Sequence, residues 1–373
     1  MNNVISDISK APLFFFLLIV SLTVQAQTTK FSIIAYYSGG PETVDSIPAE
    51  KLTHIIFSFC HLKGNRLNVD NGRDSVTIQK LVGLKTRNPE LKVILSLGGW
   101  GGCPSCSDVF STAHGREEFA QSTLELNQYF KSDGIDLDWE YPTIEGHPGH
   151  KFVPEDMKNF TALVQELRRR MGRNYEISFA AGGFQKFLDE SVEWIPVMTQ
   201  VDRVNIMSYD LINGYSTVTG HHTPLYSTPK QHESTDNAVQ YLIKLGIPRN
   251  KLVIGGAFYA RVWENVPSKN KGLYQPGKFK TSIDYKKFPT ELSPQSGFVH
   301  YWDDVAKAPY AYNEKKKLFA TFDDKKSIRH KTQYAIDNQL DGIMFWELTH
   351  DTRDGLVDVI YNLKQEAFAE KKQ

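Results

Sequence analysis

The chain has 373 residues, which is long enough to bury a large core in one big domain or two modest ones. Hydrophobic residues make up 40% and charged residues 23%, which is typical of a globular protein and excludes a wholly disordered chain. Lys plus Arg and Asp plus Glu both number 43, so the balanced charge gives no electrostatic reason to expect nucleic acid or an anionic membrane as a partner.

The first 26 residues have the pattern of a secretory signal peptide. Lys10 precedes the apolar run 13–20, and a small residue, Ala26, stands at the expected cleavage site. The run is shorter than the ~20 residues that a helix needs to span a bilayer, and a retained membrane anchor is the alternative. We expect a mature protein that is secreted or periplasmic, monomeric and free of the membrane.

Eight short apolar runs alternate with amphipathic stretches along the remaining chain. Several runs are almost continuous in Val, Ile and Phe, as parallel strands covered on both faces should be. Eight β-α units in ~250 residues favour an α/β fold of the (β/α)8 TIM-barrel type over an open sheet. The predicted strands are residues 31–37, 53–60, 92–97, 134–140, 176–181, 203–209, 251–259 and 341–346, and the helical patterns include 116–131, 154–170, 190–199 and 234–245.

A segment of roughly eighty residues separates the seventh and eighth predicted strands. A connection of this length would be unusual in a compact domain unless it folded on its own. We interpret residues 261–325 as a small α+β insertion domain between strand 7 and helix 7, on the carboxyl-terminal rim of the barrel. The barrel itself then comprises residues 27–260 and 326–373.

Three cysteines are too few for a disulfide framework. Cys103 and Cys106 stand close together in a Gly-rich loop after a predicted strand, and a local disulfide is the preferred interpretation in an oxidising compartment. A redox dithiol and a zinc site are alternatives, but the motif opens no small redox domain and lacks evident further ligands. Cys60 ends an apolar run and is expected to be buried.

Acidic residues recur at a spacing of two in the segment 133–142. On a strand, Asp136, Asp138 and Glu140 share one face. Burial and like-charge repulsion disfavour three ionised carboxylates there, so protons must be shared or pKa values must separate. One carboxyl can then stay protonated near neutral pH and act as a general acid. Glu140 comes last, at the strand end where barrel active sites form. A metal site or a solvated acidic strand is the alternative.

Asp133, Asp136, Asp138 and Glu140 together resemble the DxxDxDxE signature of glycoside hydrolase family 18, the chitinase family. Other segments are similar to motifs of the same family at the ends of predicted strands, so that the resemblance covers essentially the whole mature chain. These segments are Ser96-Leu-Gly98-Gly99 with Trp100, Met207-Ser-Tyr209-Asp210, Ala257-Phe-Tyr-Ala-Arg261 before the insertion, and Gly342-Ile-Met-Phe-Trp346.

The resemblance implies a retaining, substrate-assisted mechanism without a cofactor or a metal, in which the 2-acetamido oxygen of the substrate attacks the anomeric carbon. Glu140 would protonate the leaving oxygen and later activate water. Asp138 would bind the acetamido N–H, and Asp136 would share a proton with Asp138. Tyr209 would hold the acetamido oxygen in line for the attack.

The resemblance also suggests substrate-binding and supporting residues around these four. Trp346 is expected to form the floor under the distorted sugar, and Trp100 and Tyr141 are expected to form walls of adjacent subsites. Tyr36 and Phe57 either contact sugar or pack in the core. The other binding candidates are Met207, Asp210, Arg261 and Tyr215, the last of which stands where many relatives have Trp, and the supporting candidates are Asp133, Ser96, Gly98 and Gly99.

The function that follows from the resemblance is the hydrolysis of chitin or chitooligosaccharides. An endo-β-N-acetylglucosaminidase acting on glycoprotein or peptidoglycan-like glycans is the first alternative, because it shares the signature and the mechanism. A chitin-binding lectin is the second, although such proteins typically lose the residue at the position of Glu140. The adjacent His221 and His222 invite a metal interpretation, and an ordinary loop beside the cleft is favoured because no further ligands stand near them in sequence.

Overall fold

The computed structural model describes residues 31–369, and the predicted signal peptide at 1–26 lies outside the described residues. Eight parallel strands follow one another around a closed barrel, since β1 pairs both with β2 and with the last strand, β14. The predicted (β/α)8 barrel is therefore confirmed. In order around the barrel the strands are β1 (Ser32–Tyr37), β2 (His54–Lys63), β4 (Lys92–Gly98), β5 (Gly134–Asp138), β6 (Glu176–Gly182), β7 (Arg203–Met207), β8 (Leu252–Ala257) and β14 (Gly342–Trp346).

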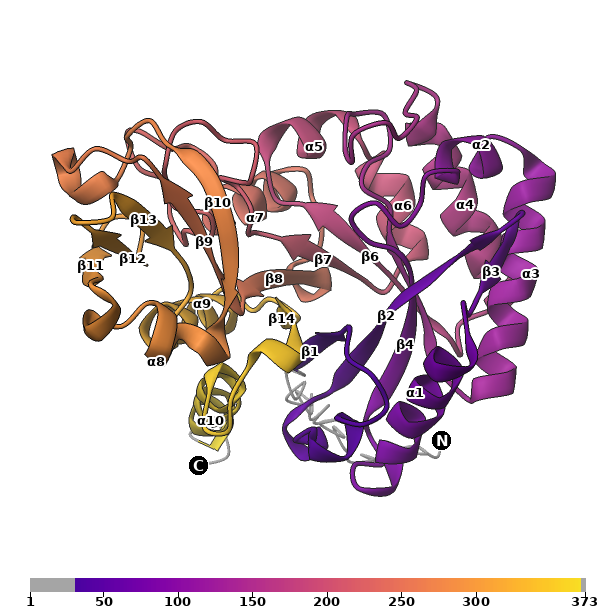
Figure 1. Cartoon of the computed structure of the whole chain (residues 1–373). Helices are drawn as coiled ribbons and strands as arrows, with labels where there is room; N and C mark the ends of the chain where they lie inside the picture. The colour runs from indigo at the N-terminus through magenta and orange to yellow at the C-terminus, as the bar shows by residue number, and fades with distance from the viewer. Residues whose placement is uncertain (1–30, 370–373) are drawn as a thin grey trace, which may run out of the picture. The chain divides into compact units, whose positions relative to one another are not determined.

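Helices cover the outside of the barrel (Figure 1). Strand residues such as Ile55, Val93 and Ile135 are buried against them in the main hydrophobic core. None of the helices in residues 31–369 is long and apolar enough to cross a bilayer. The helices are α1 (Gly72–Gly83), α2 (Cys106–Phe110), α3 (Ala113–Phe130), α4 (Asp156–Met171), α5 (Gln185–Glu190), α6 (Trp194–Gln200), α7 (Thr235–Lys244), α9 (Lys325–Asp337) and α10 (Leu356–Ala369).

The helical pattern at 190–199 differs from the single helix that was expected. The chain instead forms α5, which ends at Glu190, and a separate α6, which begins at Trp194. Pro196 stands in the first turn of α6. Backbone N–H groups there have no partner within the helix, so the N–H that proline lacks costs no hydrogen bond. In the interior of a continuous helix the same proline would clash with the carbonyl four residues earlier, so the break between the two helices follows from its position.

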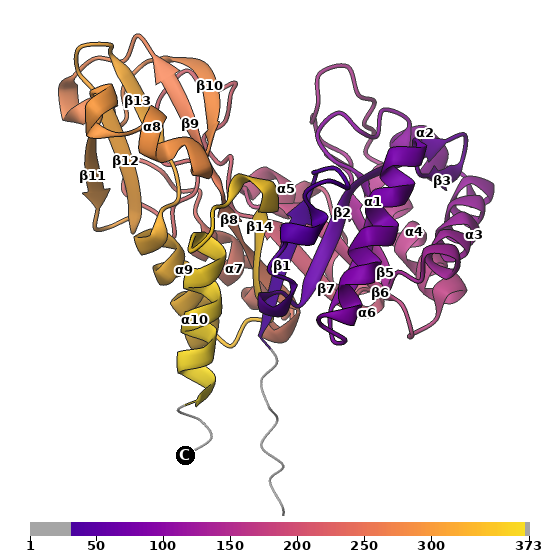
Figure 2. The ribbon, with the colours of Figure 1, turned by 60° about the horizontal axis from the view of Figure 1, so that its bottom comes forward.

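A second sheet occupies the predicted insertion between the seventh barrel strand and its helix (Figure 2). Its five antiparallel strands lie in the order β10-β9-β13-β12-β11. Apolar side chains fill both faces, with Val262 in one cluster and Trp263 in the other. The elements are β9 (Tyr259–Glu264), β10 (Lys278–Asp284), α8 (Phe288–Glu291), β11 (Val299–Asp303), β12 (Ala308–Asn313) and β13 (Leu318–Thr321), while the remaining strand, β3 (Arg66–Asn68), pairs with the end of β2.

A buried ion pair joins this sheet to the barrel where the chain returns to it. The Lys331 ammonium lies 2.6 Å from Asp323 Oδ2, and both side chains are completely inaccessible to solvent. The same carboxylate oxygen accepts hydrogen bonds from the backbone N–H of Ala257 and from the Thr223 hydroxyl. One carboxylate therefore connects the end of β8, where the chain enters the insertion, with the helix that follows it.

A charged cluster lies at the opposite, amino-terminal end of the barrel strands. Arg203 pairs with Glu176 and with Asp341, at 2.7 Å for the latter, and also contacts His54 Nε2 at 2.6 Å. Burial and the neighbouring Arg203 lower the pKa of His54 to about 4, so the imidazole is neutral near pH 7. These side chains begin or precede strands β2, β6, β7 and β14, so the cluster belongs to the base of the barrel.

Candidate active site

The acidic residues of β5 form a row that rises from the barrel interior toward its mouth. Asp136 is fully buried and Asp138 is 4% exposed, whereas Glu140, two residues beyond the strand, is partly exposed. Ile135 and Leu137, on the other face, lie in the core under the helices. The alternation that the sequence predicts therefore places three carboxyl groups on the inner side of one strand.

Asp136 is held at the bottom of the row by four neutral donors from other barrel strands. Its Oδ2 accepts hydrogen bonds from Tyr36 Oη at 2.9 Å and Ser96 Oγ at 3.1 Å, and its Oδ1 accepts from Ser178 Oγ at 2.6 Å and Asn205 Nδ2 at 3.1 Å. Burial raises the Asp136 pKa, and these hydrogen bonds act against the rise. Ser96 was expected to support the acidic row, whereas Ser178 and Asn205 were not singled out.

Asp138 is the residue of the row with an unsatisfied oxygen. Burial, followed by the charges of Glu140 and Asp136, raises its pKa well above the usual range. Its Oδ1 is buried and has no hydrogen-bond partner within residues 31–369. An unpaired buried acceptor costs about 1–3 kcal/mol, so this oxygen is placed to receive a donor from a bound ligand.

Glu140 has the pKa of a group that exchanges its proton near neutrality. Burial is the main cause of a rise to about 7, the Asp210 charge adds to it, and a hydrogen bond from Tyr141 opposes it. A carboxyl with a pKa near the working pH is suited to donate and then recover a proton. The position of Glu140 at the mouth leaves it accessible to a substrate.

Aromatic rings line the mouth on the side opposite Glu140. Trp346 is partly exposed and its ring lies 6.0 Å from that of Tyr36 and 5.6 Å from that of Phe59, with the latter pair nearly parallel at 14°. Tyr209 is 9% exposed, and its hydroxyl lies 3.8 Å from the sulfur of Met344. Met207 belongs to the same inner cluster.

Phe57 does not join this cluster, and its assignment as a sugar-contacting ring is corrected. It is 3% exposed and packs in the core between the barrel and the helices. The pairing of β2 with β4 shifts register between Phe57 and Cys60, so the alternation is interrupted there and Phe59 faces Trp346 instead. Sequence analysis did not single out Phe59, because the irregularity that turns it toward Trp346 leaves no local pattern in the sequence.

Gly98 and Gly99 allow close approaches that a side chain would block. A Cβ atom on Gly98 would lie 2.2 Å from the backbone oxygen of Asp138, and one on Gly99 would lie 2.3 Å from the Phe59 ring. Both glycines also have positive φ angles, 107° and 80°. Asp133, the out-of-phase acid, accepts a hydrogen bond from the Val93 N–H at 2.7 Å and so ties β4 to β5.

Asp210 lies at the rim and is held by two side chains from neighbouring segments. Arg261 donates two hydrogen bonds to its carboxylate, and His222 Nδ1 lies 3.4 Å from it. These partners hold the Asp210 pKa below its usual range although burial alone would raise it. His221 points to a different carboxylate, Asp303, at 3.1 Å. Among residues 31–369 no group of three or more potential ligands gathers to hold a metal ion.

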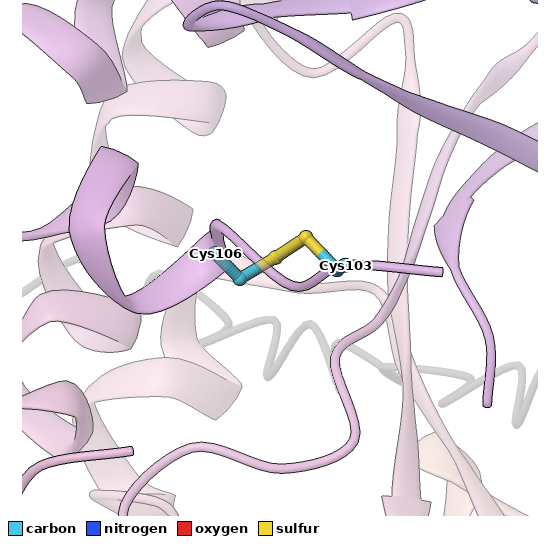
Figure 3. Close-up of a disulfide and its surroundings, with 2 residues drawn as sticks. All are labelled: Cys103 and Cys106. Atoms are coloured by element: carbon cyan, nitrogen blue, oxygen red, sulfur yellow. A yellow bond between two sulfur atoms is a disulfide. The ribbon is translucent and has the colours of Figure 1, made fainter. Parts of the chain in front are cut away.

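Loops after three strands bring further aromatic rings to the rim. The Trp100 ring lies 6.4 Å from Tyr141 and 6.3 Å from Tyr215, and it is 49% exposed. The loop that carries Trp100 continues to the Cys103–Cys106 disulfide, which joins the loop to the first residue of α2 (Figure 3). Sequence analysis named all three rings, but their mutual contacts depend on the loop conformations.

Comparison with known proteins places this site in a family. Residues 32–351 match the family described as glycosyl hydrolases family 18, and the chain belongs to it. The protein is thus a glycoside hydrolase with a TIM-barrel fold. Chitinase A1 of Niallia circulans is 34% identical over 298 residues, which cover 74% of this chain and 42% of that protein.

Two further comparisons extend the range of relatives. The oviduct-specific glycoprotein of Mus musculus is 28% identical over 89% of this chain and 49% of its own length, so the chain spans less than half of these two curated relatives. Among solved structures, a family 18 N-acetylglucosaminidase from Paenibacillus barengoltzii is 35% identical, with a TM-score of 0.82 over 90% of this chain and 100% of that chain.

Proposed function

We propose that this protein hydrolyses β-1,4 bonds between N-acetylglucosamine units of chitin or chitooligosaccharides. The buried and unpaired Oδ1 of Asp138, directly between Asp136 and Glu140 in the row, carries the proposal. An acetamido N–H is a neutral donor that would satisfy this oxygen. The names of the relatives, chitinase and N-acetylglucosaminidase, support a substrate that bears such a group.

The geometry supports a substrate-assisted reaction. Protonated Glu140 gives its proton to the glycosidic oxygen as the bond from that oxygen to the anomeric carbon breaks. The acetamido oxygen of the same sugar forms the new bond to the anomeric carbon, while Asp138 holds the acetamido N–H and balances the developing positive charge. Water then attacks the anomeric carbon as its bond to the acetamido oxygen breaks, and the water gives a proton to the Glu140 carboxylate, so the anomeric configuration is retained.

Two aromatic side chains would position the sugar for this step. Among residues 31–369 the Tyr209 hydroxyl has only the weak acceptor sulfur of Met344 as its hydrogen-bond partner, which leaves it available to the acetamido oxygen. The partly exposed Trp346 ring offers a flat apolar face to the C–H groups of the sugar. Both groups lie in or against the inner cluster and are held by its packing.

The rate should fall as the pH rises through about 7. Glu140 must be protonated to donate. With its pKa of about 7, about half of the carboxyl groups are protonated at pH 7, about a tenth at pH 8 and about a hundredth at pH 9. A profile of kcat/KM between pH 5 and 9 on a chitooligosaccharide measures this limb. The free energy of unfolding over the same range serves as the control, and a rate that stays level to pH 9 would contradict the assignment of Glu140.

The N-acetyl group should be required at the sugar whose bond is cut. Chitotetraose should be cleaved, whereas the same oligomer with free amines should not, because an amine provides no acetamido oxygen. Mass spectrometry of the products measures both reactions. A high-mannose glycoprotein tests the alternative endo-β-N-acetylglucosaminidase, and release from the glycoprotein alone would overturn the chitinase proposal.

We also propose that the protein is secreted or periplasmic and acts as a monomer. The signal pattern at residues 1–26 supports secretion, and the Cys103–Cys106 disulfide fits an oxidising compartment.

A further inference from the structure

The adjacent histidines His221 and His222 are buried titratable groups that the proposed reaction leaves unused. Both side chains are completely inaccessible to solvent. His221 Nε2 lies 3.1 Å from Asp303, the last residue of β11 in the insertion sheet. His222 Nδ1 lies 3.4 Å from Asp210, at the rim of the active site. One histidine of the pair therefore faces the insertion, and the other faces the substrate path.

Backbone hydrogen bonds hold His222 beside Asp210. The backbone N–H of His222 donates to the hydroxyl of Thr321, the last residue of β13, at 3.1 Å. Its carbonyl accepts from the N–H of Leu211 at 3.0 Å, and Leu211 directly follows Asp210 in the chain. The Tyr259 ring lies 5.2 Å from the imidazole. The side chain of His222 is thus fixed between the segment after β7 and the insertion sheet.

The His222 imidazole has a hydrogen-bond donor that is not fully used. Burial lowers the pKa of His222 although Asp210 opposes the shift, so the ring is neutral near pH 7. A carboxylate can only accept, so the Nδ1 that faces Asp210 carries the hydrogen. Among residues 31–369 neither ring nitrogen makes a hydrogen bond of good geometry. Hydrogen bonds around active sites are often long before substrate binds and then tighten, and the 3.4 Å contact is of this kind.

The Asp210 carboxylate is fixed from one side by the insertion sheet. Arg261, on β9, donates two hydrogen bonds to it, and Tyr259 of the same strand also faces it. The φ angle of Asp210 is 56°, a left-handed conformation that side-chain residues seldom adopt and that is concentrated at functional sites. The charge of Asp210 contributes to the raised pKa of Glu140, so the carboxylate lies close to the acid. His222 supplies a donor to this carboxylate from a different segment of the chain.

We propose that His222 is a positioning residue for Asp210. The imidazole N–H and the Arg261 guanidinium hold the carboxylate from two segments, so that Asp210 presents a fixed acceptor to a hydroxyl or amide N–H of the sugar beside Glu140. This inference rests on the proposed hydrolysis of N-acetylglucosamine polymers. His222 contributes to substrate binding and takes no part in the proton transfer, because it touches neither the sugar nor Glu140.

The test compares two substitutions of His222 with chitotetraose as the substrate at pH 6, where Glu140 is mostly protonated. His222→Leu removes the donor and should raise KM by roughly 3- to 10-fold while kcat stays within about twofold. His222→Asn places an amide N–H near the position of Nδ1 and should keep KM within about twofold of the wild-type value. Calorimetry of the same oligomer, with each change made in the Glu140→Gln variant, should give the same ratios in Kd.

The neighbouring histidine provides the matched control. His221→Leu removes an equally buried imidazole that faces Asp303 instead of Asp210. It should lower the free energy of unfolding as His222→Leu does, but it should leave KM unchanged. Should His222→Leu fail to fold, His222→Gln makes the same comparison with His222→Asn, because its amide reaches the position of Nε2 and leaves Nδ1 without a substitute.

The possible outcomes separate positioning from a structural role. An unchanged KM for His222→Leu, an equal rise for His221→Leu, or no recovery by His222→Asn would overturn the inference. A wild-type chain that cleaves chitotetraose while any of these results holds leaves the proposed function intact. Cleavage of no N-acetylglucosamine oligomer by the wild-type chain would overturn the proposed function itself, and the inference with it.

Discussion

Replacing Glu140 by Gln is expected to lower kcat on chitooligosaccharides by about a thousandfold while leaving their binding nearly unchanged. The amide has the shape of the protonated carboxyl but has no proton to donate to the leaving oxygen. The partly exposed position of Glu140, together with its pKa of about 7, supports the proposal that this residue of the acidic row transfers the proton. Steady-state kinetics and isothermal calorimetry with a chitooligosaccharide measure the two quantities.

A matched control for this change lies five residues farther along the chain. Glu145 is exposed on the loop after β5, and Glu145→Gln makes the same chemical change outside the row. It should retain the wild-type kcat. If Glu140→Gln kept a tenth of the wild-type rate, the acid would have to be another group, and Asp138 would be the first to examine.

The second large effect concerns stability. Arg203→Met should lower the free energy of unfolding by about 3–5 kcal/mol, which is typical when one partner of a buried ion pair is removed. The substitution would leave Glu176 and Asp341 buried without the guanidinium that pairs with both. His54 would also lose the donor to its Nε2. Urea unfolding followed by circular dichroism measures the change.

Arg249→Met provides the comparison for this second prediction. Arg249 is exposed near the start of β8 and bonds only to Asn338 in the described part of the chain. Its replacement should change stability by about 0.5 kcal/mol or less. If Arg203→Met lowered the free energy of unfolding by less than about 1 kcal/mol, the charged cluster at the base of the barrel would have to relax or admit water.

The acidic row and the barrel could be predicted because each follows from a local periodicity. Apolar runs of strand length defined the eight strands, and the spacing of two put Asp136, Asp138 and Glu140 on one face. Phe57 packs in the core because it shares the helix-facing side of β2 with Ile55. The register shift that follows it, which no local pattern signals, turns Phe59 toward Trp346. The partner of Arg261 within the site, Asp210, could not be chosen from sequence, since the pair joins segments 51 residues apart.

The contact between the Trp100 and Tyr215 rings shows the other limit of sequence reasoning. Trp100 was expected to form a subsite wall because it follows a strand end, and Tyr215 was a binding candidate because it stands where many relatives have Trp. Their contact depends on a disulfide-closed loop on one side and on hydrogen bonds to the insertion sheet on the other. Such tertiary contacts carry no periodic signal.

The Asp323 carboxylate has a consequence for anyone who would redesign this molecule. Its bonds to the Ala257 N–H and to Lys331 hold together the two places where the polypeptide crosses between barrel and insertion. A chimera made by exchanging the insertion alone would inherit one half of this junction from each parent. The transplantable unit is therefore larger than the sheet, and it extends from the end of β8 into the second turn of α9.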